Sequence, residues 1–129
     1  MKHNEYSLQK MVCSYLNLQH SSTLYMSDTI AAVKLMPQQA NRNKAIQKEG
    51  FKTPDIIIFR PNQKYHGLFI ELKIDTPFRR DGEIKASQDD HLKKQLETLN
   101  QLEKLGYKAV FAWDFDQCKQ IIDDYMKLL

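Results

Sequence analysis

The chain has 129 residues, a formal net charge of +3 and 42% hydrophobic residues, which suits one hydrophobic core and a single domain spanning residues 1–129. No apolar run approaches the length that spans a bilayer, and the N-terminus has no apolar signal region, so we expect a cytoplasmic protein without membrane contact. Cys13 and Cys118 lack a CxxC spacing and the histidines are scattered, which argues against a zinc cluster.

A first helix is predicted from Glu5, because apolar residues recur from Leu8 to Leu16 at helical spacing. Glu5 precedes Leu8 by three residues and therefore falls on or beside the buried stripe. Two interpretations remain open. Glu5 is either a first-turn acid favoured by the helix dipole or a carboxylate that reaches a site at the head of the helix.

The middle of the chain is its most basic part. Residues 34–64 contain seven Lys and Arg against two acids, a net charge of +5. Pro37 and Gly50 bracket a predicted helix that is polar on most sides. We expect its basic side chains to bind the phosphates of a nucleic acid, and a solvated surface helix is the alternative. These side chains are Arg42, Lys44 and Lys48.

Two apolar strands follow, at residues 55–59 and 68–74, and a short polar connection between them predicts a hairpin. Side chains alternate along a strand, so Glu71 and Lys73 share one face with Phe69. Asp55 begins the first strand and Glu71 lies toward the end of the second. An antiparallel pairing therefore brings the two carboxylates together, with Lys73 close by.

Ionised groups inside an apolar strand cost several kcal/mol unless a partner or a metal compensates them. Two neighbouring carboxylates repel each other, and a hard cation such as Mg²⁺ relieves that repulsion through oxygen ligation. Lys73 would then orient or help to deprotonate the attacking water, or neutralise charge on a phosphate. The alternative is a simple Glu71–Lys73 ion pair, with Asp55 merely ending a turn.

A long polar loop is expected at residues 75–87, and loops of that length are often functional. We expect it to grip phosphates on the other side of the site, and a mobile solvated loop is the alternative. Its basic side chains are Arg79, Arg80 and Lys85.

The third helix is predicted at residues 88–104, with Gln95 pointing in the same direction as Leu92 and Leu99. A core-facing amide needs hydrogen-bond partners, so Gln95 is either a site residue or a boundary residue satisfied by water. A last strand at residues 107–113 and a helix capped by Asp114 complete the scaffold, to which we assign no chemistry.

Pro54-Asp55 followed by Glu71-Leu72-Lys73 resembles the motif of the PD-(D/E)XK nuclease superfamily. More narrowly, the run 65–73, Gln95 and the run 105–109 are similar to its VRR-NUC branch, and the likeness extends from Glu5 to about Tyr125. The resemblance implies an α/β, restriction-endonuclease-like core, a mixed β-sheet flanked by helices in the order α-β-α-β-β-α-β-α.

The same resemblance implies a magnesium-dependent DNA endonuclease in which Mn²⁺ can substitute. Asp55, Glu71 and the Leu72 carbonyl would be metal ligands, Lys73 would position the water, and Glu5 and Gln95 would complete the catalytic set. Stand-alone members of this branch resemble phage and bacterial homodimers that act on branched DNA such as Holliday junctions. A phage-encoded chain would work in the host cytoplasm. The alternatives are a non-catalytic DNA-binding module of the same fold and a structural or partner-binding protein.

Overall fold

The computed structural model describes residues 4–28, 35–87 and 90–129. Within these residues the elements follow the predicted order α-β-α-β-β-α-β-α. They are α1 (Glu5–Gln19), β1 (Tyr25–Ser27), α2 (Pro37–Ile46), β2 (Ile56–Ile58), β3 (Leu68–Leu72), α3 (His91–Lys104), β4 (Lys108–Ala112) and α4 (Phe115–Met126). The predicted start of the third helix at Gln88 lies outside the described residues.

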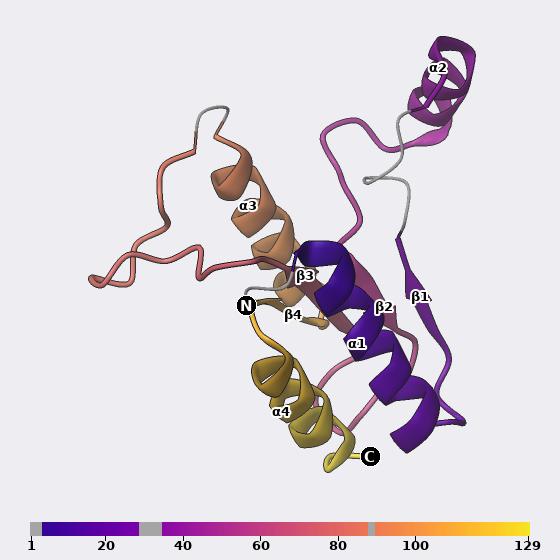
Figure 1. Cartoon of the computed structure of the whole chain (residues 1–129), viewed down its shortest axis with the longest axis vertical. Coiled ribbons are helices and arrows are strands. Elements are labelled where there is room, and N and C mark those ends of the chain that lie inside the picture. The colour runs from indigo at the N-terminus through magenta and orange to yellow at the C-terminus, as the bar shows by residue number, and fades with distance from the viewer. Residues whose placement is uncertain (1–3, 29–34, 88–89) are drawn as a thin grey trace.

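The strands form one mixed sheet in the order β1-β2-β3-β4 (Figure 1). β2 and β3 make the predicted antiparallel hairpin, with Ile56 opposite Ile70. β4 runs parallel to β3, and Glu71 lies opposite Phe111 in that pair. The hairpin prediction is therefore confirmed, and it sets the positions of the charged side chains on β3.

Two apolar clusters lie on opposite faces of the sheet. The larger one joins α1 and α4 to the alternate β3 residues Leu68, Ile70 and Leu72, which are all at most 1% exposed. The smaller one joins α3 to β4 and to Phe69 of β3. Because Glu71 has the same parity as Phe69, it lies on the face that α3 covers.

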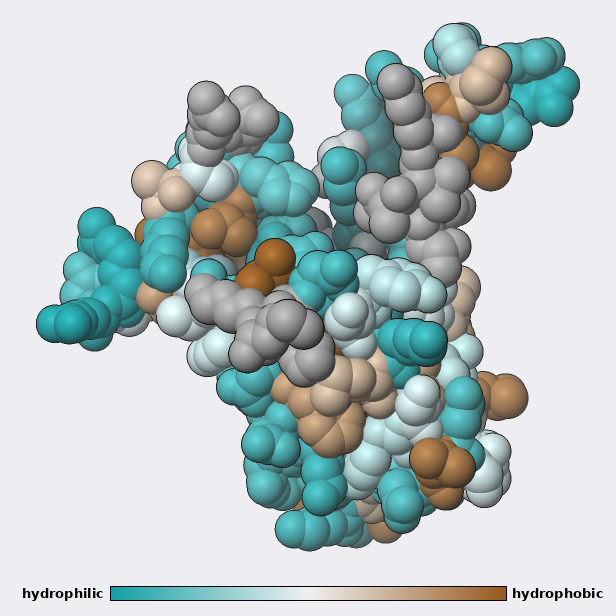
Figure 2. Space-filling view, in the orientation of Figure 1, coloured by the Kyte–Doolittle hydropathy of each residue, from teal (hydrophilic) through white to brown (hydrophobic). Residues whose placement is uncertain are grey.

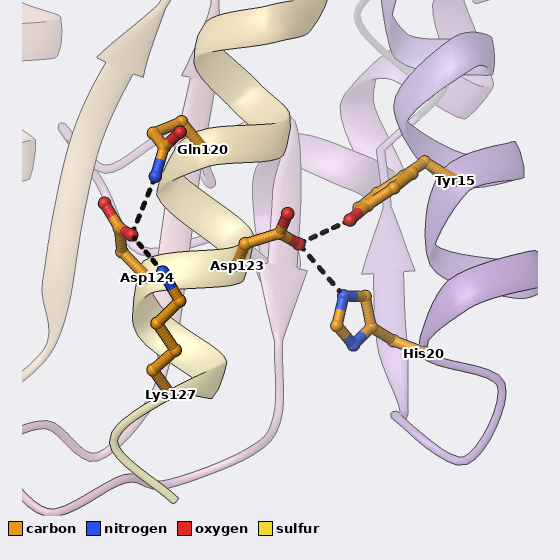
Figure 3. A network of polar contacts seen from close by, with 6 residues as sticks. All are labelled: Tyr15, His20, Gln120, Asp123, Asp124 and Lys127. Carbon is orange, nitrogen blue, oxygen red and sulfur yellow. Dashed lines mark hydrogen bonds and ion pairs between the residues drawn. The ribbon is translucent and has the colours of Figure 1, made fainter.

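Polar contacts also fasten α4 to the rest of the molecule. The Asp114 carboxylate caps α4 by accepting a hydrogen bond from the Gln117 N–H at 2.7 Å, as predicted. Figure 3 shows a second contact, in which Asp123 of α4 accepts a hydrogen bond from the Tyr15 hydroxyl and lies 3.3 Å from His20 Nε2. The C-terminal half of α1 is thereby tied to α4.

Four predicted elements end earlier than expected, and two of them, β2 and β4, stop only one residue short, at Ile58 and Ala112. β3 ends at Leu72, so Lys73 follows the strand, although its N–H still donates to the Ala112 carbonyl at 2.9 Å. α2 ends at Ile46, where Gln47 adopts an extended conformation. The prediction that Lys48 lies on this helix is therefore wrong. No part of α2 packs into a core that would extend it.

α2 stands apart from the body of the molecule in Figure 1 and buries none of its residues. Helices this short are marginally stable in water without tertiary contacts. It is also free of acidic residues, so its charge is purely basic. Its exposed surface is therefore available to a partner.

Nowhere among residues 4–28, 35–87 and 90–129 is a helix both long and apolar enough to cross a membrane.

Gly106, between α3 and β4, is the first testable position. Its φ is 96°, and a Cβ there would lie 2.5 Å from Cδ2 of His66. Gly106→Ala should lower the free energy of unfolding by about 2 kcal/mol, because it adds this overlap to the cost of a left-handed backbone. Gly82→Ala is the matched control, since Gly82 has φ 85° with nothing within 4 Å. Equal losses in denaturant titrations of the two variants would contradict the overlap.

Candidate active site

Asp55 and Glu71 face each other at the end of the β2–β3 hairpin. The register that pairs Ile56 with Ile70 continues to these two residues, so their side chains lie on the same face of the sheet. They are close enough for a hydrogen bond between their carboxyl groups. Oδ2 of Asp55 also accepts a hydrogen bond from the Leu72 N–H at 2.7 Å.

The pair is protonated more readily than free carboxylates. Burial raises the pKa of Glu71 to about 8, the charge of Asp55 adds to the rise, and the charge of Lys73 opposes it. Burial also raises the pKa of Asp55, against the hydrogen bond from Leu72, which lowers it. Without a cation, therefore, the pair keeps a proton to a higher pH than free carboxyl groups do. Such a pair is typical of a functional site.

Pro54 explains why the hairpin ladder stops at this pair. In the β2–β3 register it stands opposite Leu72, and proline has no N–H to donate. Separately, the Leu72 N–H donates to the Asp55 carboxylate. Pro54 therefore gives the Leu72 carbonyl no ladder hydrogen bond, which makes this carbonyl a candidate oxygen ligand.

Gln95 reaches the pair from α3. Its Nε2 donates to Oε1 of Glu71 at 2.8 Å, which confirms that the amide points inward to the charged face of β3. Its Oε1 is buried without a hydrogen-bond partner among the described residues. A buried acceptor without a donor is costly, so this oxygen can accept a hydrogen bond from a ligand or a water.

Lys73 is half-buried, and its positive charge lowers the pKa of both carboxyl groups. The ion pairs between described residues link His20 to Asp123, Arg79 to Asp81 and Lys127 to Asp124, and none links Lys73 to Glu71. The simple ion-pair interpretation is therefore not supported. Lys73 keeps an ammonium group near the carboxyl pair.

Glu5 is the exposed first residue of α1. Its negative charge raises the pKa of Asp55 and of Glu71, so it lies near the pair. It also occupies the first turn, where the helix dipole favours an acid. Its position agrees with the helix-dipole interpretation, and its role as a site residue stays a prediction.

The structure brings together Glu5, Asp55, Glu71, Leu72, Lys73 and Gln95, and leaves the six basic candidates outside this group. Arg42 and Lys44 lie on α2 with Lys48 just beyond it, and the loop carries Arg79, Arg80 and Lys85. All six are exposed. Figure 1 shows the two projections on opposite sides of the molecule, with the N-terminal end of α1 between them in this view, and their surfaces are mainly hydrophilic (Figure 2).

The oxygen atoms of the candidate site can be compared with the ligands that Mg²⁺ prefers. The described residues contain no group of three or more His, Cys, Asp or Glu side chains arranged around one point. Two carboxylates and the Leu72 carbonyl oxygen nevertheless suit Mg²⁺, which prefers oxygen and usually keeps several of its waters. The sequence prediction missed the Leu72 N–H bond to Asp55, although Pro54 signals an interrupted ladder.

No family model matches this sequence, and no curated protein matches it. Among solved structures, a chain described as a VRR_NUC domain protein superposes with a TM-score of 0.67 at 24% sequence identity. The superposition covers 100% of this chain and 93% of that chain. This chain has the VRR_NUC fold. The likeness confirms the mixed α/β architecture that the sequence resemblance implies. In the VRR_NUC fold of this chain, the Asp55–Glu71 pair lies at the end of the β2–β3 hairpin.

Proposed function

We propose that this protein is a magnesium-dependent DNA endonuclease. The observation that carries the proposal is the largely buried Asp55–Glu71 pair with its raised pKa, set on adjoining strands beside Lys73 and Gln95. The name of the structural neighbour, which designates a nuclease domain, supports it. Mn²⁺ should replace Mg²⁺, because it accepts the same oxygen ligands.

Each residue of the candidate site has a separate role in the proposed hydrolysis of the phosphodiester bond. Asp55, Glu71 and the Leu72 carbonyl would hold the cation. Mg²⁺ supplies a Lewis acid that polarises the phosphate and lowers the pKa of water. Gln95 orients the Glu71 carboxyl group through a 2.8 Å hydrogen bond from its Nε2. Lys73 aligns the attacking water or neutralises phosphate charge, and Glu5 adds a third acid.

The exposed basic residues would hold the DNA on either side of this site. Arg42 and Lys44 lie on α2, which has no acidic side chains, and Lys48 follows it. Arg80 and Lys85 lie on the opposite projection. Contacts of this kind bind phosphates without regard to base sequence and weaken steeply as salt increases.

Selectivity for branched DNA needs a fixed distance between two sites, and a symmetric homodimer would provide it. The surface that supports a dimer is an apolar patch at the β1–β2 edge, formed by Leu24, Met26 and Phe59, which are 75%, 46% and 57% exposed. Leu24 and Phe59 are ladder partners, joined by a 3.0 Å hydrogen bond from the Phe59 N–H. All three side chains therefore project from one face, and a second copy would cover them.

Phe59→Glu should convert the dimer to a folded monomer, because a carboxylate in the middle of this patch cannot be covered by an apolar partner. Light scattering with size-exclusion chromatography measures the change. Leu18→Glu is the control, since Leu18 is 78% exposed on α1 and is not part of the patch. A wild-type monomer, or a Phe59→Glu dimer, would contradict this surface assignment.

The function itself is tested by incubating the protein with labelled linear, flap and four-way DNA, with Mg²⁺ or with chelator. Cleavage that needs Mg²⁺ supports the endonuclease, and preferential cutting of the four-way DNA supports branch selectivity. Binding without cleavage would indicate a DNA-binding module. Neither binding nor cleavage would indicate a structural or partner-binding protein.

A further inference from the structure

The segment after β3 is a small hairpin rather than the structureless loop that the sequence predicts. Phe78 and Ile84 form an antiparallel bridge. The Arg79 N–H donates to the Glu83 carbonyl and the Lys85 N–H to the Pro77 carbonyl, each at 2.8 Å. A tight turn closes it, since the Gly82 N–H donates to the Arg79 carbonyl at 3.0 Å. This segment, residues 77–85, is called the 77–85 hairpin below.

The base of the hairpin is fixed beside the candidate active site. The Phe78 ring contacts Phe111 and Trp113 edge to face, with ring centroids 5.8 and 6.3 Å apart. Phe111 is the residue opposite Glu71 in the β3–β4 register. Ile84 packs against the same apolar cluster beneath α3. The hairpin therefore projects from the body at a set distance from the carboxyl pair (Figure 1).

The tip of the hairpin presents one available cation. Arg79 is engaged with Asp81 through two hydrogen bonds, of 2.8 and 3.3 Å. Arg80 occupies the apex of the turn, is exposed, and makes no ion pair with any described residue. The net charge of the hairpin is only +1. A charge this small gives little general attraction, so a contact with DNA here would depend on individual side chains.

We propose that the 77–85 hairpin is a rigid DNA-contact element whose Arg80 binds the phosphates of a duplex arm extending from the cut site past α3. This inference rests on the proposed function and narrows its substrate class to DNA with a duplex arm on that side of the scissile phosphate. Because the hairpin is already ordered, holding Arg80 in place costs little entropy on binding. Arg79 supports the turn and does not contact the DNA.

The test measures DNA affinity by fluorescence anisotropy in chelator, at several salt concentrations, for wild type, Arg80→Ala and Arg79→Ala. Arg80→Ala should weaken binding about fivefold near physiological salt and lower the salt dependence by about one phosphate contact. Arg79→Ala should change the DNA affinity and its salt dependence less than Arg80→Ala does. Arg80→Lys should keep most of the wild-type affinity and salt dependence.

The same measurement with DNA trimmed on one side of the branch at a time locates the contact. The Arg80→Ala effect should disappear when the arm past α3 is removed and persist when the other arm is removed. Equal affinities for the Arg80→Ala and Arg79→Ala variants on every DNA would overturn the inference. If wild type cleaves DNA with Mg²⁺ but Arg80→Ala binds DNA as tightly as wild type, the Arg80 contact is wrong and the proposed nuclease function stands. If Arg80→Ala weakens DNA binding but wild type does not cleave, the nuclease function is wrong and the Arg80 contact stands.

Discussion

Lys73→Ala should reduce the rate of Mg²⁺-dependent DNA cleavage by about a thousandfold and leave DNA affinity nearly unchanged. Its ammonium group stands next to the Asp55–Glu71 pair without an ion pair to Glu71, so removing it affects the attacking water and not the fold. Positioned proton-transfer groups typically contribute factors of this size. Asp55→Asn should abolish cleavage as well, because it removes a ligand charge that holds the cation.

Single-turnover cleavage of labelled DNA measures this effect. Lys10→Ala is the control, because Lys10 is an exposed cation on α1 outside the candidate site. Thermal unfolding of each variant separates a catalytic loss from a loss of structure. Cleavage at the wild-type rate by Lys73→Ala would contradict the catalytic role of Lys73. Cleavage at the wild-type rate by Asp55→Asn would contradict the role of the carboxyl pair.

In the absence of divalent cations, the free energy of unfolding should fall as the pH rises from about 4.5 to about 8. The pKa of Glu71 is about 8 in the folded chain against an ordinary value of 4.5. A raised pKa stabilises the fold fully below the unfolded value and loses that contribution as pH rises through the folded value. The raised pKa of Asp55 acts in the same direction. The loss should be several kcal/mol at most.

Urea titrations in chelator across this pH range measure the slope. Glu71→Gln should be the more stable protein at pH 8 and should show a much flatter profile, since the amide keeps the partner of Gln95 without a titrating charge. Saturating Mg²⁺ should restore wild-type stability at high pH, because a ligand that binds the folded state stabilises it. Parallel profiles for wild type and Glu71→Gln would contradict the raised pKa.

The site could be largely predicted because its geometry follows from local rules. Alternation along a strand placed Glu71 and Lys73 on one face, and hairpin pairing placed Asp55 opposite Glu71. Helical spacing from Leu92 correctly indicated that Gln95 points inward. These inferences need only the period of one element and the direction of its neighbour.

The remaining features depend on contacts between residues that no local pattern links. The position of the 77–85 hairpin depends on the packing of Phe78 against Phe111 and Trp113 in β4 and the residue after it. Its turn could have been predicted, since Asp-Gly at 81–82 is a hairpin signal. The separation of α2 from the body of the protein could not be predicted. A polar helix has the same sequence pattern whether its exposed side faces solvent or DNA.

The central claim is that Asp55 and Glu71 hold one divalent cation between them. Anomalous diffraction from crystals soaked in Mn²⁺ tests it most directly. We expect an anomalous peak within coordination distance of both carboxylates and the Leu72 carbonyl, and no such peak in Asp55→Asn crystals. A Mn²⁺ ion bound elsewhere, or the same peak in the Asp55→Asn variant, would contradict it.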